Sequence, residues 1–275
     1  MLEKLLIGAG AMKAGTTWLY KQLETHPHIR FTPEKEIHYF SHINELGHKL
    51  DHPKRLEKLD RVIARGGDES LVNWYKRYAL PEELNNDWYC ALFDGVPKKA
   101  YCADFSNQYS LLPEKSLEQI QKAANDVKVM YTLRDPLARL WSHVKFQYKF
   151  IGDEHRVDNI DVAEFRRMIN KAWFWENTRY VANYDRLVSV FGKENVKLFY
   201  LEDFIAFPQG SLWNIEKFLH IKHIEFKADA AVTKVNKTKE FAMPEQWEKI
   251  ALRKLKPVYE ELYNRDLSHP SWKSH

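Results

Sequence analysis

Residues 7–17, Ile-Gly-Ala-Gly-Ala-Met-Lys-Ala-Gly-Thr-Thr, join a short apolar run to a turn of small residues, a lysine and two hydroxyls. The pattern predicts a strand, a tight turn and the start of a helix. Backbone N–H groups and the positive end of a helix converge at such a turn and favour an anion. Lys13 adds a flexible cation, and Gly15 allows close backbone approach. With the hydroxyls of Thr16 and Thr17, this set suits a phosphate or sulfate group.

The order of these residues separates the loop from a nucleoside triphosphate P-loop. In that motif, G-x-x-x-x-G-K-[ST], the lysine follows the last glycine, whereas Lys13 precedes Gly15. The inversion argues against a kinase or an ATPase. A structural interpretation stays open, in which Thr16 caps the helix and Lys13 is solvated.

A second candidate site lies at residues 133–142, Leu-Arg-Asp-Pro-Leu-Ala-Arg-Leu-Trp-Ser. Arg134 is expected where a buried strand ends, and Asp135 and Pro136 suit the first positions of a helix. Ser142 then lies about two turns into that helix, so it can reach the same anion as Arg134. A planar guanidinium with a hydroxyl suits a phosphate monoester. Alternatively, Arg134 pairs with Asp135 and Ser142 bonds to its own helix.

Apolar, β-branched and aromatic residues predict four buried strands, at residues 5–9, 100–103, 127–133 and 196–201. Helices are predicted at about residues 15–23, after Pro136, and at about 177–191 and 244–264. This alternation predicts an α/β fold with a P-loop-like parallel sheet flanked by helices on both faces. Ligands of such sheets bind beyond the carboxyl ends of the strands.

The 275 residues, 44% of them hydrophobic, are expected to form a single domain covering residues 1–275. The segment from about residue 42 to 95 is rich in aromatic and charged residues and predicts a helical insertion. The net charge of +4 and the absence of a Lys/Arg-rich run favour a local anion pocket over a nucleic-acid partner.

Cys90 and Cys102 are the only cysteines, and their spacing indicates neither a disulfide framework nor a zinc site. The first ten residues carry Glu3 and Lys4 within their apolar run, which argues against a signal peptide. No run of about 18 apolar residues predicts a transmembrane segment. We therefore expect a cytoplasmic protein with reduced thiols.

With both anion sites in place, the chain resembles the sulfotransferases that use 3′-phosphoadenosine 5′-phosphosulfate (PAPS). Lys-x-Gly-Thr-Thr matches their 5′-phosphosulfate loop, and Arg-Asp-Pro with a serine eight residues after the arginine matches their 3′-phosphate site. Residues 35–40, Lys-Glu-Ile-His-Tyr-Phe, are similar to the K-E-I-H-F-F segment of heparan sulfate-type and related bacterial carbohydrate sulfotransferases. Residues 235–241, Val-Asn-Lys-Thr-Lys-Glu-Phe, are similar to the family's N-x-T-K-G-F cofactor loop.

The resemblance implies three catalytic residues: Lys13, Glu36 and His38. Lys13 would stabilise charge on the leaving oxygen, and Glu36 would take the proton of the acceptor. His38 lies two residues further on, on the same side of an extended segment, and would hold the acceptor or share the proton. Two structural interpretations stay open: Glu36 forms a salt bridge with Lys13 or Lys35, and His38 is a structural histidine.

Binding of PAPS and of its product, 3′-phosphoadenosine 5′-phosphate (PAP), is expected at one set of residues. Arg134, Ser142 and Lys239 would bind the 3′-phosphate. Trp18 or Phe241 would stack on adenine, although Trp18 also fits a core position. No metal is expected, because side chains supply the cations. The full expected set is Lys13, Ala14, Gly15, Thr16, Thr17, Trp18, Arg134, Ser142, Tyr200, Lys237, Thr238, Lys239 and Phe241.

The chain departs from the family pattern in two places. Glu240 replaces a glycine of the cofactor loop, which could weaken backbone approach to the 3′-phosphate. In residues 103–110 the relatives read G-E-x-T-P-x-Y-S or E-K-T-P-x-Y. Here Asp104 replaces the acid or lysine of those patterns, and Asn107 replaces the proline. This segment faces the acceptor in the family, so we expect Asp104, Ser106 and Tyr109 to bind substrate.

The predicted function is in-line transfer of a sulfuryl group from PAPS to a hydroxyl or amine, on a carbohydrate or another polar small molecule. A kinase or ATPase is one alternative, supported by residues 100–104 as a strand ending in an acid, and a magnesium requirement would distinguish it. A non-catalytic anion- or glycan-binding module is the other. Glu36 and His38 beside the loop argue against it, and PAP binding without transfer would favour it. The oligomeric state is not predicted.

Overall fold

A computed structural model describes residues 1–46, 50–153, 155–156, 160–225 and 242–272. Within these ranges the chain forms a parallel sheet of five strands in the order β2-β3-β1-β4-β5. The strands are β1 (Leu2–Gly10), β2 (Ile29–Phe31), β3 (Tyr101–Asp104), β4 (Ala124–Leu133) and β5 (Val196–Tyr200). The four predicted strands are confirmed. Strand β2 was not predicted, because only Ile29 of its three residues is buried and no apolar run marks it.

The central strand β1 is buried on both faces, which explains its apolar run. Leu5, Ile7 and Ala9 belong to the larger hydrophobic cluster on one face of the sheet. Leu6 belongs to a second cluster on the other face. Alternate side chains of a strand point to opposite faces, so a strand covered on both sides needs apolar residues at every position. The predicted α/β fold with helices on both faces is confirmed.

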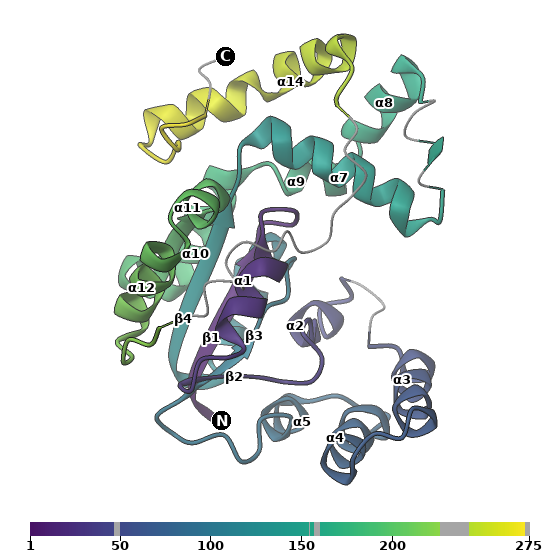
Figure 1. The fold of residues 1–275 in the computed structure, drawn as a ribbon, viewed down its shortest axis with the longest axis vertical. Helices are drawn as coiled ribbons and strands as arrows, with labels where there is room; N and C mark the ends of the chain where they lie inside the picture. The colour runs from purple at the N-terminus through teal and green to yellow at the C-terminus, as the bar shows by residue number, and fades with distance from the viewer. Residues whose placement is uncertain (47–49, 154, 157–159, 226–241, 273–275) are drawn as a thin grey trace.

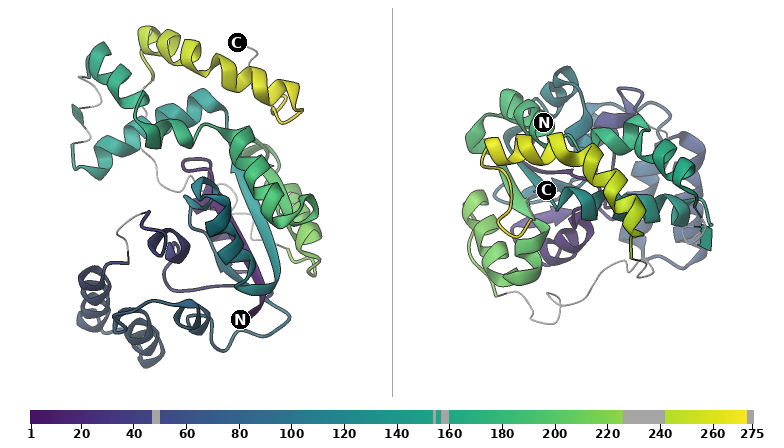
Figure 2. Two further views of the ribbon diagram at one scale, coloured as in Figure 1. Left: turned by 180° about the vertical axis from the view of Figure 1, so that it is seen from behind. Right: turned by 90° about the horizontal axis from the view of Figure 1, so that it is seen from above.

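Helices form two layers over the sheet and a third group beyond its carboxyl end (Figure 1; Figure 2 adds the views from behind and above). Leu19, Phe204 and Leu212 place α1, α11 and α12 against one face. Leu117 and Leu187 place α6 and α10 against the other. The helices are α1 (Thr16–Leu23), α6 (Glu114–Gln121), α7 (Pro136–Phe150), α8 (Val162–Ile169), α9 (Ala172–Glu176), α10 (Tyr180–Phe191), α11 (Leu201–Ala206), α12 (Pro208–Leu219) and α14 (Glu245–Asn264).

The predicted helix positions agree closely with these bounds. Helix α7 begins at Pro136, and the Asp135 side chain caps it by accepting from the Ala138 N–H at 2.8 Å. The helix predicted from about residue 177 begins at Tyr180, because residues 172–176 form the separate short helix α9. These helix starts fix where the residues of the second candidate site lie.

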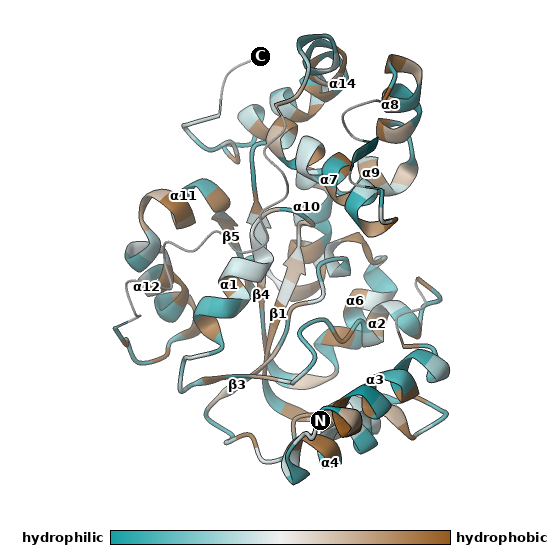
Figure 3. Cartoon of the chain, turned by 45° about the vertical axis from the view of Figure 1, so that its right-hand side comes forward, coloured by the Kyte–Doolittle hydropathy of each residue, from teal (hydrophilic) through white to brown (hydrophobic). Residues whose placement is uncertain are grey.

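The predicted insertion contains α3 (His52–Ala64), α4 (Glu69–Ala79) and α5 (Asn86–Ala91), and no strand among its described residues. Figure 3 shows both hydrophilic and hydrophobic residues along α3 and α4, as expected of helices with one buried face. The insertion is tied to the core chain through Glu34. Lys58 pairs with that carboxylate at 2.6 Å, and the Tyr75 hydroxyl donates to it at 2.7 Å. The segment that follows β2 is therefore anchored from outside the sheet.

Candidate active site

The loop that connects β1 to α1 has a backbone that only certain residues tolerate. Lys13 and Gly15 both adopt positive φ, at 70° and 89°. A Cβ on Gly15 would lie 2.6 Å from Cδ1 of Leu201, so the position requires glycine. Gly15 occupies the N-cap of α1 without a side-chain hydrogen bond, which makes the alternative of a Thr16 cap wrong. The N-terminus of α1 thus opens onto this loop.

Lys13 lies at the centre of a concentration of positive charge. Its Nζ lies 4.3 Å from the centroid of the Phe146 ring, which half-buries the cation. Burial, together with Arg134, Lys149 and other nearby lysines, lowers the pKa of Lys13 to about 8. The alternative of a solvated lysine does not describe this environment. A bound anion would relieve the repulsion among these cations.

Arg134 follows β4 and reaches the same loop. Its guanidinium donates to the carbonyl of Lys13 at 3.3 Å, and burial lowers its pKa. The Tyr180 hydroxyl donates to the carbonyl of Arg134 at 2.9 Å. Asp135 caps α7, and its carboxylate also accepts from the Tyr259 hydroxyl at 2.8 Å. A simple surface ion pair with Arg134 therefore does not describe this carboxylate. The two predicted anion sites therefore lie side by side at adjacent strand ends.

A buried arginine holds α7 in place beneath this site. Arg139 is fully buried and donates to the Thr178 hydroxyl at 2.6 Å and to the Phe174 carbonyl at 3.3 Å. It also lies 3.2 Å from Nδ1 of His143. Burial and the charge of Arg139 lower the pKa of His143 to about 2, so the imidazole is neutral and its Nδ1 accepts. These bonds fix the helix that carries Ser142.

Glu36 lies in the irregular segment between β2 and α2 (Tyr39–His42) and contacts the anion loop through Lys35. Its Oε1 accepts from Lys35 Nζ at 3.3 Å and from Asn107 Nδ2 at 2.9 Å. Its Oε2 lies 3.3 Å from Nε2 of His38. Lys35 Nζ also donates to the Thr17 hydroxyl at 3.1 Å. The salt bridge between Glu36 and Lys35, one of the structural alternatives for Glu36, is therefore present. It coexists with the contact between Glu36 and His38.

Asp104, Ser106 and Tyr109 are fully buried beneath this segment. Their side chains bond to one another, since the hydroxyls of Ser106 and Tyr109 both donate to the Asp104 carboxylate, at 2.6 and 2.9 Å. The expected contact of these residues with an acceptor stays a prediction. Their burial favours a role beneath the site.

A sequence model described as Sulfotransferase family matches residues 6–225, a range that includes both candidate anion sites and Glu36. The chain belongs to the sulfotransferase family. Comparison with the curated proteins gives no match.

Solved structures similar to this sulfotransferase share its fold across nearly the whole chain. A sulfotransferase from Alicyclobacillus acidocaldarius is 20% identical with a TM-score of 0.67, and 98% of each chain is covered. The sulfotransferase domain from the Synechococcus PCC 7002 olefin synthase is 16% identical with a TM-score of 0.56, covering 93% of this chain and 96% of that domain. The sulfotransferase domain from the curacin biosynthetic pathway is 15% identical, with a TM-score of 0.54 over 92% of this chain and 98% of that domain. At these identities the likeness shows the fold.

The remaining predicted residues of the sulfotransferase lie in different surroundings. Ala14 is buried within the loop. Trp18 stacks on Phe204 with ring centroids 5.1 Å apart, which agrees with the core alternative. The Tyr200 hydroxyl donates to the carbonyl of Leu267 at 3.1 Å. The expected cofactor roles of these three residues stay predictions. One group of predicted residues lies outside the described residues: Lys237, Thr238, Lys239 and Phe241, together with Glu240.

Sequence reasoning assigned no site role to Lys35, Asn107 or Phe146, which all contact predicted catalytic residues. Lys35 could have been found, because it adjoins Glu36 and a cation there complements an anion loop. Phe146 lies four residues after Ser142, so helical spacing places both on one face of α7. The pairing of Asn107 with Glu36 joins positions 71 residues apart, and no local signal marks it.

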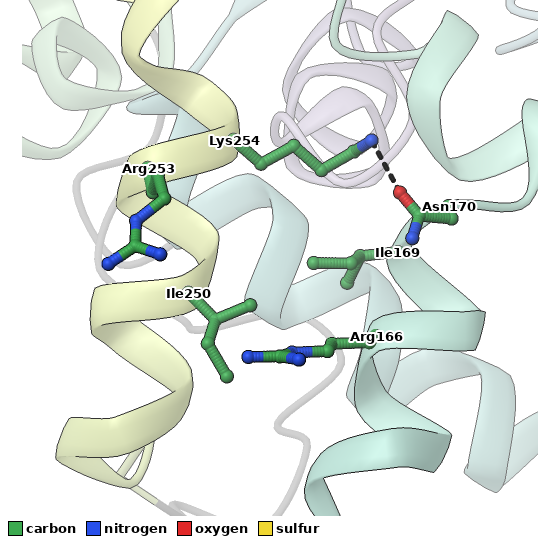
Figure 4. A pocket seen from close by; sticks show the side chains of 6 residues that line it. All are labelled: Arg166, Ile169, Asn170, Ile250, Arg253 and Lys254. Atoms are coloured by element: carbon green, nitrogen blue, oxygen red, sulfur yellow. Dashed lines mark hydrogen bonds between the residues drawn. The ribbon is translucent and has the colours of Figure 1, made fainter.

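A separate hollow of about 370 Å³ lies between α8 and α14 (Figure 4). Lys254 Nζ donates to Oδ1 of Asn170 across it at 2.6 Å. The residues that line it are Arg166, Ile169, Asn170, Ile250, Arg253 and Lys254. None of them is a predicted site residue or a carboxylate.

Among the described residues, no group of three or more His, Cys, Asp and Glu side chains is arranged to hold a metal ion. In the same part of the chain, no helix combines the length and the apolar character needed to cross a membrane.

Proposed function

We propose that this sulfotransferase transfers a sulfuryl group from PAPS to a hydroxyl or amine of an acceptor, on a carbohydrate or another polar small molecule, by in-line displacement. The observation that carries the proposal is the position of Lys35. Its Nζ lies 3.1 Å from the Thr17 hydroxyl of the anion loop and 3.3 Å from the Glu36 carboxylate. A single side chain thus places a candidate base beside a candidate site for the transferred group.

The residues present fit a nucleotide with two separate anionic ends. Lys13, with Thr16 and Thr17 at the start of α1, would bind the 5′-phosphosulfate. Arg134 and Ser142 would bind the 3′-phosphate. Bound PAPS would supply the sulfuryl group. The lowered pKa values of Lys13 and Arg134 support this fit, because both cations are buried close together where anions would stabilise them.

The chemistry of the chain's own residues follows from their contacts. Glu36 would accept the acceptor proton at Oε2, the oxygen that faces His38, while Lys35 and Asn107 hold Oε1. His38 would orient the acceptor or share that proton through Nε2. The ammonium group of Lys13 would stabilise negative charge on the leaving phosphate oxygen.

Two other functions fit the geometry less well. A kinase or ATPase would need Asp104 to bind magnesium, yet this carboxylate is fully buried and accepts from Tyr89, Ser106 and Tyr109. A non-catalytic anion-binding module would gain nothing from a carboxylate beside its anion loop, because like charges repel. Glu36 therefore favours an enzyme that moves a proton.

Incubation with PAPS labelled in its sulfuryl group tests the proposal. The acceptors are 4-nitrophenol, glucosamine, a neutral oligosaccharide and a fractionated extract of the source organism. We expect labelled product and stoichiometric PAP, with no need for added magnesium. PAP binding without transfer to any acceptor would favour a binding module. Magnesium-dependent transfer of the γ-phosphate of ATP would favour a kinase.

A further inference from the structure

A buried carboxylate joins three hydroxyl groups beneath the candidate active site. Asp104, the last residue of β3, is fully buried. Its Oδ1 accepts from the Ser106 hydroxyl at 2.6 Å, and its Oδ2 accepts from the hydroxyls of Tyr109 at 2.9 Å and Tyr89 at 3.2 Å. Burial raises the pKa values of both tyrosines well above the ordinary value, so both remain donors. All of these side chains are thereby held in fixed positions.

Two of the three hydroxyls continue the network to the backbone of the segment that carries Glu36. The Ser106 hydroxyl accepts from the His38 N–H at 2.9 Å. The Tyr109 hydroxyl accepts from the Phe40 N–H at 3.4 Å. His38 adopts a φ of 59°, a conformation that a residue with a Cβ disfavours, so external bonds are needed to hold it. Among the described residues, the Tyr89 hydroxyl has no hydrogen bond to this segment, whereas the other two hydroxyls contact it directly.

We propose that Asp104 is a positioning residue for sulfuryl transfer, which acts through Ser106 and Tyr109 to hold the backbone at His38 and Phe40 and thereby aims the Glu36–His38 pair at the anion loop. The inference rests on the proposed function, in which Glu36 takes the acceptor proton. It is an alternative to the prediction that Asp104, Ser106 and Tyr109 contact the acceptor themselves.

The two tyrosines provide a matched comparison. Tyr89→Phe and Tyr109→Phe each delete one hydroxyl, and both hydroxyls donate to the same carboxylate oxygen from fully buried rings. Only the Tyr109 hydroxyl also accepts from the Phe40 N–H. A role in stability alone predicts similar effects of the two substitutions, whereas positioning predicts that only Tyr109→Phe lowers turnover.

The kinetic test uses the full chain with PAPS and the best acceptor from the panel above. A geometric error at a catalytic group lowers turnover steeply, so we expect Ser106→Ala to lower kcat about tenfold and Tyr109→Phe about fivefold. The kcat of Tyr89→Phe should stay within about twofold of the wild-type value. The dissociation constant of PAP, measured by isothermal titration, should be unchanged in all three. Ser106→Thr keeps the hydroxyl and should restore most of the lost turnover.

A second readout does not depend on catalysis. Hydrogen exchange of the His38 amide should be slow in the wild-type protein and faster in Ser106→Ala, and the Phe40 amide should respond in Tyr109→Phe but not in Tyr89→Phe. If the wild-type protein transfers no sulfuryl group, the proposed function fails, and the exchange data still decide whether the network holds this segment.

The proposal is overturned if Ser106→Ala and Tyr109→Phe keep wild-type kcat, or if Tyr89→Phe lowers kcat as much as Tyr109→Phe. It is also overturned if the three variants lose PAP affinity in parallel with turnover, because that pattern indicates a general loss of folding. Unchanged exchange at the His38 amide in Ser106→Ala would equally contradict it.

Discussion

The candidate active site has two sides that are built in different ways. The cation side comprises Lys13, Arg134 and Ser142, which lie after β1, after β4 and on α7. The acid side comprises Glu36 and His38, in the irregular segment between β2 and α2. Regular elements place the first set. Hydrogen bonds from residues that follow β3, more than 65 positions away in the chain, place the second.

In the proposed function, this difference separates binding of the donor from transfer of the sulfuryl group. Backbone ladders and helix packing hold the cation side rigidly, as electrostatic recognition of an anion requires. The acid side depends on side-chain bonds to Ser106 and Asn107, so small changes there can misplace the carboxylate without disturbing the cation side. Substitutions of Arg134 or Ser142 should therefore change donor affinity, and those on the acid side should change turnover. Substitutions of Lys13, which also stabilises the leaving oxygen in the proposed function, should change both.

Glu36→Gln should have the largest effect and tests the acid side. Loss of a general base lowers turnover by about 100-fold or more, so we expect at least that decrease in kcat. Glutamine still accepts from Lys35 and Asn107, so the dissociation constant of PAP should stay within about twofold of wild type. Steady-state kinetics and calorimetry measure the two quantities. Near-normal kcat would remove Glu36 as the base.

Arg134→Ala is the matching substitution on the cation side. Loss of a charge-assisted bond to phosphate should raise the KM for PAPS and the dissociation constant of PAP by about 30-fold. Turnover at saturating PAPS should fall much less. Arg134→Lys keeps the positive charge but lacks the planar guanidinium. Its KM for PAPS should therefore lie between those of the wild type and Arg134→Ala. An unchanged KM would refute the 3′-phosphate assignment.

The pKa of Lys13, about 8, predicts a pH dependence of donor binding. Below that pH the ammonium group is charged and attracts an anion. Above it the free protein loses the proton, so binding becomes weaker as the pH rises. We expect the dissociation constant of PAP to rise about tenfold between pH 7.5 and pH 9.5. In Lys13→Arg the side chain stays charged over this pH range, so the dissociation constant should rise much less. An equal rise in that variant would assign the pH dependence to another group.

Ser142→Ala should have the smallest effect. The hydroxyl offers a neutral hydrogen bond, so its loss should raise the dissociation constant of PAP about threefold to fivefold. Adenosine 5′-phosphosulfate, which lacks the 3′-phosphate, serves as the control ligand in calorimetry, and its affinity should not change. An equal loss of affinity for both ligands would place Ser142 elsewhere than at the 3′-phosphate.

The sequence predicted the cation side better than the acid side for a physical reason. Lys13 and Gly15 occupy a strand-to-helix turn, and Arg134 to Ser142 span a strand end and a capped helix, so local rules of spacing and capping place them. Three of the four predicted helices begin within one residue of the prediction. Residues in or beside regular elements can therefore be placed from the local sequence alone.

The acid side depends on contacts that the sequence does not display. Motif resemblance selected Glu36 and His38, but the link from Asn107 to Glu36 requires β3 to lie beside β1 and β2. The burial of Asp104 could not be inferred from a polar side chain at a strand end, where exposure is the usual outcome. Strand β2 escaped prediction for a related reason, because its three residues belong to an edge of the sheet and lack an apolar pattern.

The most direct test measures kcat at saturating PAPS for wild type, Glu36→Gln and Arg134→Ala, with the PAPS concentration set well above the KM of each protein. We predict that Arg134→Ala keeps most of the wild-type turnover under these conditions, whereas Glu36→Gln stays about 100-fold or more below it. Equal loss of turnover in both variants, or recovery of Glu36→Gln at high PAPS, would contradict the division of the site into a cation side that binds and an acid side that reacts.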